Sequence, residues 1–422
     1  MKKLLVISVM FLGSAVAGCA QQASILGIVT DSSGAVIPNA KITVSNPERG
    51  VIRHLTSNTA GSYVAADLPI GTYTVTAQVP GFRRLVTAGV VLQVGATRRV
   101  DMRLQVGQVT QAVQVTANVA HVQTETAAVS GVITGKQIAN LELNGRDFVN
   151  LMLLVPGASP DNSLDLTNTV HGGADITVSV NGGRSGMNNF MINGMPSMDE
   201  TGYGGLNVTP SLDSIQEFRV VTSTYGAEYG KLDAAQINVA TKSGTKQFHG
   251  DAYDYVRNDA FDANPFFQNR QIAPPGGNAP KTPLKWNDFG YTFGGPIYIP
   301  HYYNKDKSKT FFFWSQEWHR YNGAEVINAG VPSMAERLGD FSECDPASGS
   351  FNPIIASGCT LPSLNGVNYD TVQQAPGFNP QAYTNGTILM NSLVPLPNNG
   401  PINYVHSSPS NTDWRQEMIR VD

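Results

Sequence analysis

The sequence predicts an exported, mainly β protein. Charged residues make up 14% of the 422-residue chain, well below the roughly 25% of ordinary soluble domains. The chain also holds 42 glycines and 25 prolines. Low charge with many glycines and β-branched residues is typical of strands joined by turns. The formal net charge of −4 gives no sign of a nucleic-acid partner.

Residues 1–20 have the features of a signal peptide. Met1-Lys2-Lys3 supplies a positive start, and the apolar run that follows ends at Val16, too short for a membrane-spanning helix. Cleavage after Ala20 or Ala17 fits the small residues here. Alternatively, "VAGC" resembles a lipobox, which would leave a lipidated Cys19 as the new N-terminus. Under either reading the protein leaves the cytoplasm.

Two cysteines remain once Cys19 is removed. Cys344 and Cys359 bracket a loop-like stretch, and an oxidising compartment favours pairing them. A disulfide that closes a loop of this size stabilises a fold by roughly 3 kcal/mol in the chain-entropy model. The alternative is a pair of free, partly buried thiols. We expect the disulfide, in a structural role.

Residues 24–105 predict a β-sandwich of about seven strands. A strand from Ile25 to Thr30 meets a turn at 31–34, and a second strand starts near Ala40. In 71–79, Tyr73 and every second residue after it are apolar, while the residues between are polar. This two-residue period is typical of a half-buried strand. Turn signals recur every 8 to 12 residues, as in small sandwiches.

The order of residues in this unit is more specific than its periodicity. "GIVTDSSGAVIPNAKITV", "TAGSYVAADLPIGTYTVTA" and "PGF" resemble the carboxypeptidase regulatory-like domain, a transthyretin-like or Ig-like sandwich. The resemblance implies a carbohydrate-binding-like fold without catalytic activity. No cluster of aromatic residues and carboxylates marks a sugar site, so a spacer role is the alternative to glycan binding.

Residues 108–245 predict an α+β domain. "ITGKQIANLELNGRDFVNLMLLVPG" reads as two short helices that end at Pro156-Gly157. Strands are expected at 176–180, 189–192, 215–221 and 236–241, with one helical turn at 211–217. From the second helix onward one apolar face would hold Leu141, Phe148, Leu151, Leu154 and Val155.

Three blocks of this domain carry a second resemblance. "IANLELNGRDFVNLMLLVPG", "VNGGRSGMNNFMINGMP" and "SIQEFRVVTSTYGAEYGKLDAAQINVATKSGT" resemble the plug domain of TonB-dependent outer-membrane receptors. The family commonly has Asp-Gly where this chain has Asn193-Gly194, and Asn keeps the turn chemistry. The resemblance implies a domain that closes a barrel and moves, or unfolds locally, to pass cargo.

The same resemblance implies a TonB box, a short segment that adds as a strand to the energy-coupling protein TonB. Strand addition makes few demands on side chains, so the signal is weak. The alternative is that this segment forms the first strand of the plug. The candidate residues are Gln111, Ala112, Val113, Gln114, Val115, Thr116 and Ala117.

Residues 246–422 predict the start of a transmembrane β-barrel. In "WNDFGYTFGGPIYIP", Phe289, Tyr291 and Phe293 share one face, and small or polar residues share the other. Aromatic residues outward and small residues inward suit a strand that faces lipid. A further strand is expected at 309–320, then a long external loop at 322–412.

"GDFS…DP…G" within that loop resembles Oar-like TonB-dependent transporters, and with the two preceding domains it identifies the chain as an N-terminal part of one. Plugged barrels have about 22 strands, whereas about four are visible here. The chain ends in the strand pattern "RQEMIRVD". Because open strand edges are not viable in lipid, we expect an incomplete barrel.

The resemblance implies transport of a large or scarce nutrient, such as an oligosaccharide or peptide, across the outer membrane. The partners would be TonB with its inner-membrane energising complex and outer-membrane lipid, with both N-terminal domains on the periplasmic side. No cofactor, metal site or enzyme is expected, since none of the seven histidines sits in a zinc-peptidase motif. The alternative function is a secreted or surface binding protein that recognises glycan or protein.

Overall fold

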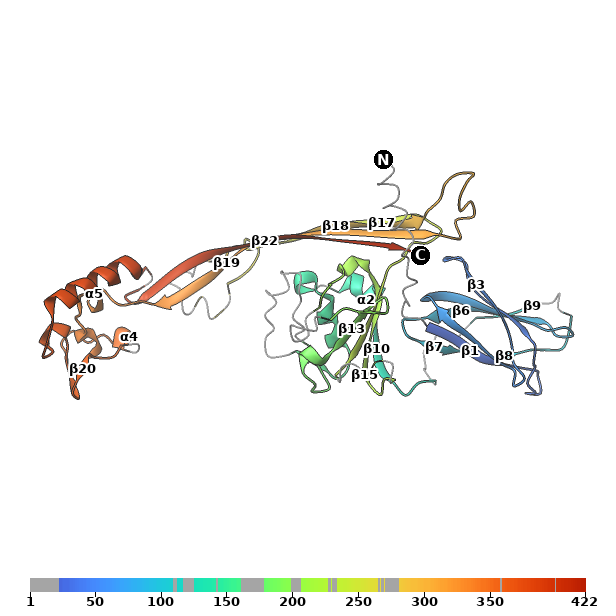
Figure 1. The fold of residues 1–422 in the computed structure, drawn as a ribbon, viewed down its shortest axis with the longest axis horizontal. Helices are drawn as coiled ribbons and strands as arrows, with labels where there is room; N and C mark the ends of the chain where they lie inside the picture. Colours follow the sequence, from blue (N-terminus) through green and yellow to red (C-terminus); the bar gives the residue numbers. More distant parts are fainter. Residues whose placement is uncertain are drawn as a thin grey trace, which may run out of the picture. The chain divides into compact units, whose positions relative to one another are not determined.

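The computed structural model describes residues 23–108, 112–116, 125–141, 143–160, 178–198, 206–226, 229, 234–264, 266, 269, 281–356, 359–398 and 400–422. The expected signal segment, residues 1–20, lies outside these ranges. The chain divides into two units. The first holds Met1–Asp254, Phe289–Trp318 and Trp414–Asp422, and the second holds Tyr255–Asp288 and His319–Asp413. Figure 1 shows the elements in chain order.

The N-terminal domain is a sandwich of two sheets. One sheet has the order β4-β1-β7, with β8 also paired to β1, and the other has the order β3-β2-β5-β6-β9. The strands are β1 (Ala23–Thr30), β2 (Lys41–Asn46), β3 (Val51–Thr56), β4 (Ser62–Leu68), β5 (Gly71–Gln78), β6 (Arg84–Leu92), β7 (Thr97–Arg99), β8 (Met102–Arg103) and β9 (Ala112–Thr116).

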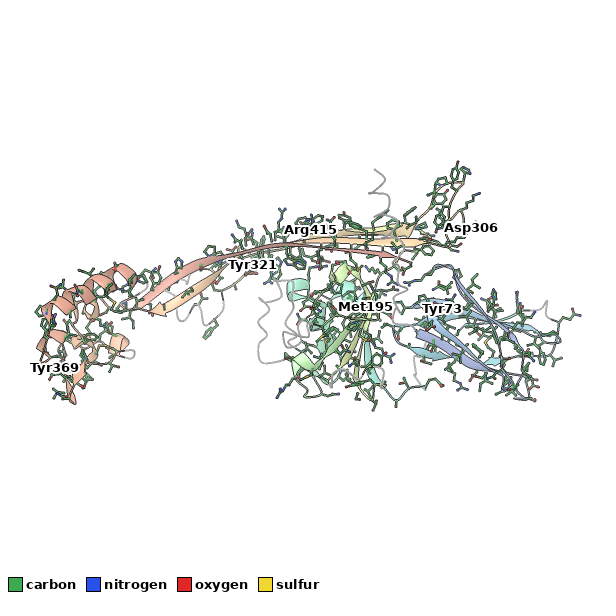
Figure 2. The ribbon with its side chains drawn as sticks, viewed as in Figure 1. Tyr73, Met195, Asp306, Tyr321, Tyr369 and Arg415 are labelled. Carbon is green, nitrogen blue, oxygen red and sulfur yellow. A yellow bond between two sulfur atoms is a disulfide. The ribbon has the colours of Figure 1, made fainter. Side chains whose placement is uncertain are left out.

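The predicted alternation of β5 is confirmed. Tyr73, Val75 and Ala77 are fully buried, and Figure 2 shows Tyr73 among the sandwich strands. The Tyr73 hydroxyl donates to the Pro69 carbonyl over 2.7 Å, which satisfies a polar group inside an apolar core. The predicted turn after β1 also forms, because Asp31 Oδ1 accepts from the backbone N–H groups of Ser33 and Ala35.

The central domain has a five-stranded sheet of order β10-β15-β16-β13-β14 and a separate β11-β12 pair. Its helices are α2 (Gly135–Asn140), η1 (Asn144–Arg146), η2 (Phe148–Leu154), η4 (Ser185–Met187) and η5 (Leu212–Ser214). Its strands are β10 (Val129–Thr134), β11 (Ala158–Pro160), β12 (Val178–Val180), β13 (Asn189–Ile192), β14 (Met195–Pro196), β15 (Ile215–Ser223) and β16 (Gln236–Thr241). The expected strands at 189–192 and 236–241 are confirmed.

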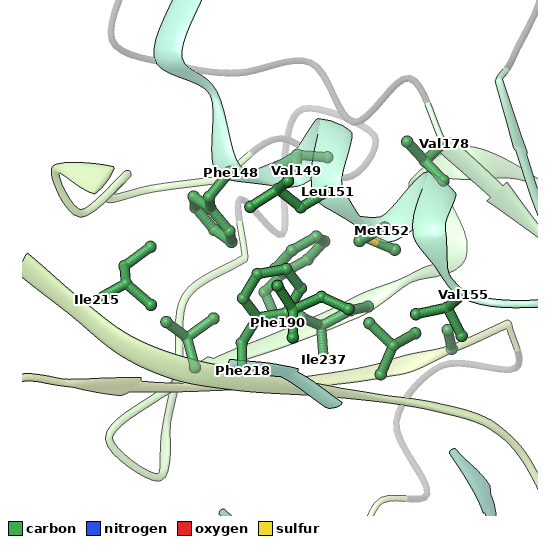
Figure 3. Packing of buried hydrophobic residues seen from close by; sticks show 14 of the residues in the cluster. Phe148, Val149, Leu151, Met152, Val155, Val178, Phe190, Ile215, Phe218 and Ile237 are labelled. Carbon is green, nitrogen blue, oxygen red and sulfur yellow. The ribbon is translucent and has the colours of Figure 1, made fainter. Parts of the chain in front are cut away.

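An aromatic core holds η2 on this sheet. Phe148 packs edge to face on Phe190 and Phe218, with ring centroids 6.2 and 5.7 Å apart, and Figure 3 shows these rings meeting between η2 and the strands. Edge-to-face pairs add about 0.5–1.5 kcal/mol beyond the apolar area they bury. Leu151 and Val155 are buried beside them.

Two details of the predicted helical face are wrong. Leu141 is 41% exposed and Leu154 is 51% exposed. The reason is local. Leu141 caps the C-terminus of α2 in an extended conformation, so it does not continue the helical face. Leu154 is the last residue of η2, and the buried side chains there are Phe148, Val149, Leu151 and Met152.

Asn193-Gly194, where the plug family commonly has Asp-Gly, forms the expected turn. Both residues are left-handed, with φ of 50° and 82°, in the two-residue connection between β13 and β14. This is the conformation that a type I′ hairpin requires. Asn193 also accepts from the Thr241 backbone N–H over 3.0 Å, so its side chain ties the turn to β16.

The third domain is built on four long strands in the hydrogen-bonded order β17-β18-β19-β22. They are β17 (His249–Asn258), β18 (Leu284–Pro296), β19 (Phe311–Gly330) and β22 (Asn403–Val421). The predicted alternation in β18 is confirmed, since Gly290, Thr292 and Gly294 are buried while Tyr291 and Phe293 are exposed. β19 alternates in the same way from Phe311 to His319.

The expected loop at 322–412 is shorter than predicted, because β19 continues to Gly330 and β22 begins at Asn403. Backbone pairing extends these strands through residues that read as turns. Between them lie η7 (Glu336–Leu338), η8 (Ser342–Cys344), α4 (Pro353–Ala356), β20 (Ser363–Leu364), β21 (Val367–Asn368), η9 (Val372–Gln374) and α5 (Pro380–Leu393). Within the described ranges, none of the helices has the length and hydropathy of a membrane-spanning helix.

Candidate functional site

The site begins with an unusual turn in the central domain. Gly145 and Arg146 both adopt left-handed backbone conformations, with φ of 74° and 52°. Such a conformation costs roughly 1–2 kcal/mol for a residue with a side chain and persists where surrounding contacts hold it. Asp147 follows and caps η2, because its Oδ1 accepts from the Val149 N–H over 2.9 Å. The turn and the cap together fix the direction of the Arg146 side chain.

Arg146 lies at the centre of a buried charge cluster. Its guanidinium contacts the carboxylate of Asp213 and lies 3.5 Å from Glu317 Oε2. It also stacks over the ring of Tyr253, 4.8 Å from the centroid. The side chains of Arg146 and Glu317 are only 8% and 2% exposed, so solvent screens these interactions little.

The cluster connects two domains of the first unit. Arg146 and Asp213 belong to η1 and η5 of the central domain, whereas Tyr253 and Glu317 belong to β17 and β19. Burial raises the pKa of Asp213, and the Arg146 cation opposes that shift. The guanidinium therefore offsets part of the cost of burying this carboxylate.

The strand side of the cluster has hydrogen bonds of its own. Tyr253 donates its hydroxyl to Glu317 Oε2 over 2.7 Å, and Gln416 Nε2 on β22 donates to Glu317 Oε1 over 2.8 Å. Nearby, the hydroxyls of Ser211 and Ser315 lie 2.9 Å apart. Both oxygens of the buried carboxylate are thus satisfied from neighbouring strands, as a buried charge requires.

A second connection lies at the end of β22. Arg420 donates to the Thr241 carbonyl over 2.9 Å and lies 3.4 Å from Asn193 Oδ1. Its Nε also donates to Asp422 over 2.8 Å. This arginine therefore reaches β16 and the β13–β14 turn of the central domain.

The N-terminal sandwich also contacts the central sheet, through side chains of β15. Glu217 accepts from the Val94 N–H over 2.5 Å, and Arg219 donates to the Gly95 carbonyl over 2.7 Å. Arg49 donates to Gln216 Oε1 over 2.7 Å. Burial raises the pKa of Glu217 and lowers the pKa of Arg219, because both charges leave water at this contact.

The outward faces of β18 and β19 carry stacked aromatic rings. Phe289 stacks on Trp318 with centroids 5.3 Å apart, and Phe293 lies 5.9 Å from Phe248 and 5.5 Å from Phe312. Phe293 remains 46% exposed. An exposed aromatic face opposite a polar, buried face is what a lipid-facing strand requires.

The predicted site residues fall in separate places. Ala112–Thr116 of the candidate TonB box form β9, which pairs in parallel with β6 of the sandwich. In the structure this segment lies in the sandwich sheet, and its role as a TonB box stays a prediction. The other candidate positions Gln111, Ala117 and Cys19 lie outside the described residues.

Cys344 and Cys359 form a disulfide in the structure, with Cα atoms 5.8 Å apart, inside the usual range for such bridges. Glu336 Oε1 lies 3.0 Å from Cys359 Sγ, so two sulfurs and a carboxylate meet at one point. Sulfurs paired with each other offer no thiolate to a metal, so this group does not form a metal site.

Sequence reasoning missed the charge cluster. Glu317 carried a signal, since it is an acidic residue between aromatic residues in a strand, on the same face as Phe311 and Phe313. Arg146 carried a weaker one, as a cation directly after a glycine in "NGRD". What pairs them is tertiary, because 171 positions separate the two residues along the chain.

Comparison with known proteins agrees with this architecture. Residues 24–105 match the carboxypeptidase regulatory-like domain, and residues 240–422 match the outer membrane beta barrel domain. The "TonB-dependent transporter Oar" of Myxococcus xanthus is 25% identical over 369 residues, which cover 84% of this chain. The aligned part is 32% of Oar, so the chain spans about a third of that relative's length.

Two solved structures show weaker likeness. The outer membrane transporter YddB from Escherichia coli aligns over 49% of this chain and 27% of its own, at 13% identity and a TM-score of 0.35. A putative carbohydrate binding protein from Bacteroides uniformis aligns over 19% of this chain and 40% of its own, at 20% identity and a TM-score of 0.17. At TM-scores this low, neither likeness supports a conclusion about this chain.

The family matches, the Oar relative and the mainly β fold lead to one identification. The chain is a homologue of TonB-dependent transporter Oar. It is an outer-membrane protein in which a carboxypeptidase regulatory-like domain precedes an outer membrane beta barrel domain.

Proposed function

We propose that this chain supplies the plug and the first barrel strands of a TonB-dependent transporter of the outer membrane. In this proposal residues 108–245 are the plug, and β17, β18, β19 and β22 are strands of the barrel that surrounds it. The similarity to Oar, which is a transporter, supports this role. We propose no catalytic activity for the chain.

The observation that carries the proposal is the contact between Arg146 and Glu317. Glu317 projects from the buried face of a strand whose other face is aromatic, so that face suits the interior of a barrel. A plug has to stay closed and still be able to move. The contact fits both needs, because Arg146 keeps Asp213 as a partner inside its own domain.

Energy would reach the plug through the candidate TonB box. TonB, driven by its inner-membrane energising complex, would pair with Gln111–Ala117 by strand addition. Tension on that segment would then pass to β10, which begins at Val129. The exposed rings of Tyr291 and Phe293 would contact outer-membrane lipid.

The cargo we propose is a large or scarce nutrient such as an oligosaccharide or a peptide. A solute of this size needs an opening that a fixed pore would leave permanently leaky, which is the physical reason for a plug. The sandwich would serve as a module on the periplasmic side.

Deleting residues 112–116 from the chromosomal gene tests the proposal. We expect normal amounts of the protein in the outer membrane, loss of crosslinking to TonB, and loss of growth on the oligosaccharide or oligopeptide that the intact strain uses as sole carbon source. A deletion of residues 118–122 shortens the same connection equally and serves as the matched control. TonB crosslinking and growth that survive the first deletion would refute the proposed coupling segment.

A further inference from the structure

The sandwich holds the candidate TonB box as one of its own strands. β9 pairs in parallel with β6, and the register joins Arg84 to Ala112, Val86 to Gln114 and Ala88 to Thr116. Among the described strands, β9 ends the order β3-β2-β5-β6-β9. The backbone groups that β9 directs toward β6 are therefore already paired.

One side chain of the segment is also engaged. Val113 packs, partly buried, against the sandwich core, and its backbone lies opposite Leu85. Strand addition draws its specificity from pockets for alternate side chains. A protein that reached β9 while it was docked would meet one free edge, with the Val113 face already covered.

The docking is built to be weak. Parallel pairing is slightly less stable per residue than antiparallel pairing, and the ladder covers five residues. Val115 is 45% exposed and Gln114 is exposed, so among the described side chains at 113–115 only Val113 gains from burial. A short strand held mainly by backbone pairing exchanges readily with the undocked chain.

We propose that the β6 edge of the sandwich withholds residues 112–116 from TonB, and that TonB must displace β6 to take the segment. This inference rests on the proposed function. It gives the carboxypeptidase regulatory-like domain a regulatory role, in which its sheet edge and TonB compete for the same strand. Release is also needed mechanically, since a pull on docked β9 loads the sandwich before it loads β10.

A reversible crosslink tests the competition. Val86→Cys and Gln114→Cys place two cysteines at opposed positions on the outward face of β6 and β9, within reach of a disulfide. The full chain with both changes is titrated with the purified periplasmic C-terminal domain of TonB, once oxidised and once reduced. We expect the oxidised form to bind at least about tenfold more weakly than the reduced form.

A control pair separates locking from mere oxidation. Thr43→Cys and His54→Cys are opposed in the β2–β3 hairpin of the same sheet, away from β9. Oxidation of this pair should leave TonB binding unchanged. Equal or tighter binding by the locked 86–114 form would overturn the competition while leaving the TonB box intact.

Failure of the proposed TonB box can be told apart from failure of the competition. If neither redox form binds the TonB domain, and a synthetic peptide of residues 108–120 does not bind it either, the segment is not a TonB box and the inference falls with it. If the peptide binds but the reduced chain does not, the sandwich withholds the segment even without a lock, which supports the inference.

Hydrogen exchange on the unmodified chain gives a check without any variant. Displacement of β9 would lower the protection of the β6 amides at 84–88 when the TonB domain binds. Binding at the free edge of β9 would leave that protection unchanged or raise it, and would refute the competition.

Discussion

Replacing Arg146 with methionine keeps much of the side-chain volume but removes the cation between Asp213 and Glu317. Breaking a buried ion pair by deleting one partner costs about 3–5 kcal/mol. Glu317 keeps its hydrogen bonds from Tyr253 and Gln416, which places the expected loss near the low end, at about 3 kcal/mol. The equilibrium constant for folding should fall by roughly two orders of magnitude.

Tryptophan fluorescence during urea unfolding in detergent measures this loss. The four tryptophans lie on β18, β19 and β22, at positions 286, 314, 318 and 414. Their emission therefore reports on the strands that hold Glu317. Arg146→Lys is the conservative comparison. It should lose less unfolding free energy than Arg146→Met because it keeps the positive charge, although it lacks the planar guanidinium group.

The double variant Arg146→Met with Glu317→Gln decides the mechanism. If the loss comes from an uncompensated carboxylate, neutralising Glu317 should recover about half of it or more. Equal stability of the single and double variants would refute the electrostatic account. Arg146 would then act by packing its guanidinium over Tyr253.

Three further predictions address the folded domains. Burial raises the pKa of Asp147 from 3.8 to about 6, so stability should fall by roughly 3 kcal/mol as pH rises from 4 through 6. Asp147→Asn keeps the cap and should remove this pH dependence in thermal unfolding; an unchanged slope would contradict the assignment. Reducing the Cys344–Cys359 bridge should destabilise its loop by about 3 kcal/mol, seen as faster proteolysis within 331–402, whereas resistance equal to the oxidised form would count against it. In Gly27→Ala the new methyl group would clash with the Val100 carbonyl oxygen. The free energy of unfolding should fall by about 3 kcal/mol or more, which lowers the melting temperature of the sandwich. Gly330→Ala, whose methyl group would meet open space, should change the melting temperature little.

The strands were the most predictable part of the fold. Tyr73 and its alternate neighbours, and the β18 face of Gly290 and Thr292, follow directly from the two-residue period of a half-buried strand. The left-handed Asn193-Gly194 turn could be anticipated because Asn tolerates positive φ. These features depend on residues close together in sequence.

The rest depended on contacts between distant residues. The 3-10 turns between Asn144 and Leu154 include the left-handed pair Gly145-Arg146, which the apolar spacing does not reveal. The Arg146–Glu317 pair joins separate domains, and the docking of β9 on β6 joins residues 28 positions apart in the chain. Strand addition in particular uses backbone groups, which leave almost no trace in side-chain sequence.

Under the proposed function, the hydrogen bonds to Glu317 would affect which solutes could pass. If residues 108–245 move as the proposed plug, Arg146 would leave with Asp213, while Tyr253 and Gln416 would stay with Glu317 on the strands. The opened passage would then carry a fixed negative charge on its wall. Such a charge repels anions and attracts cations over about a Debye length. Neutral or cationic cargo would pass this point more easily than anionic cargo.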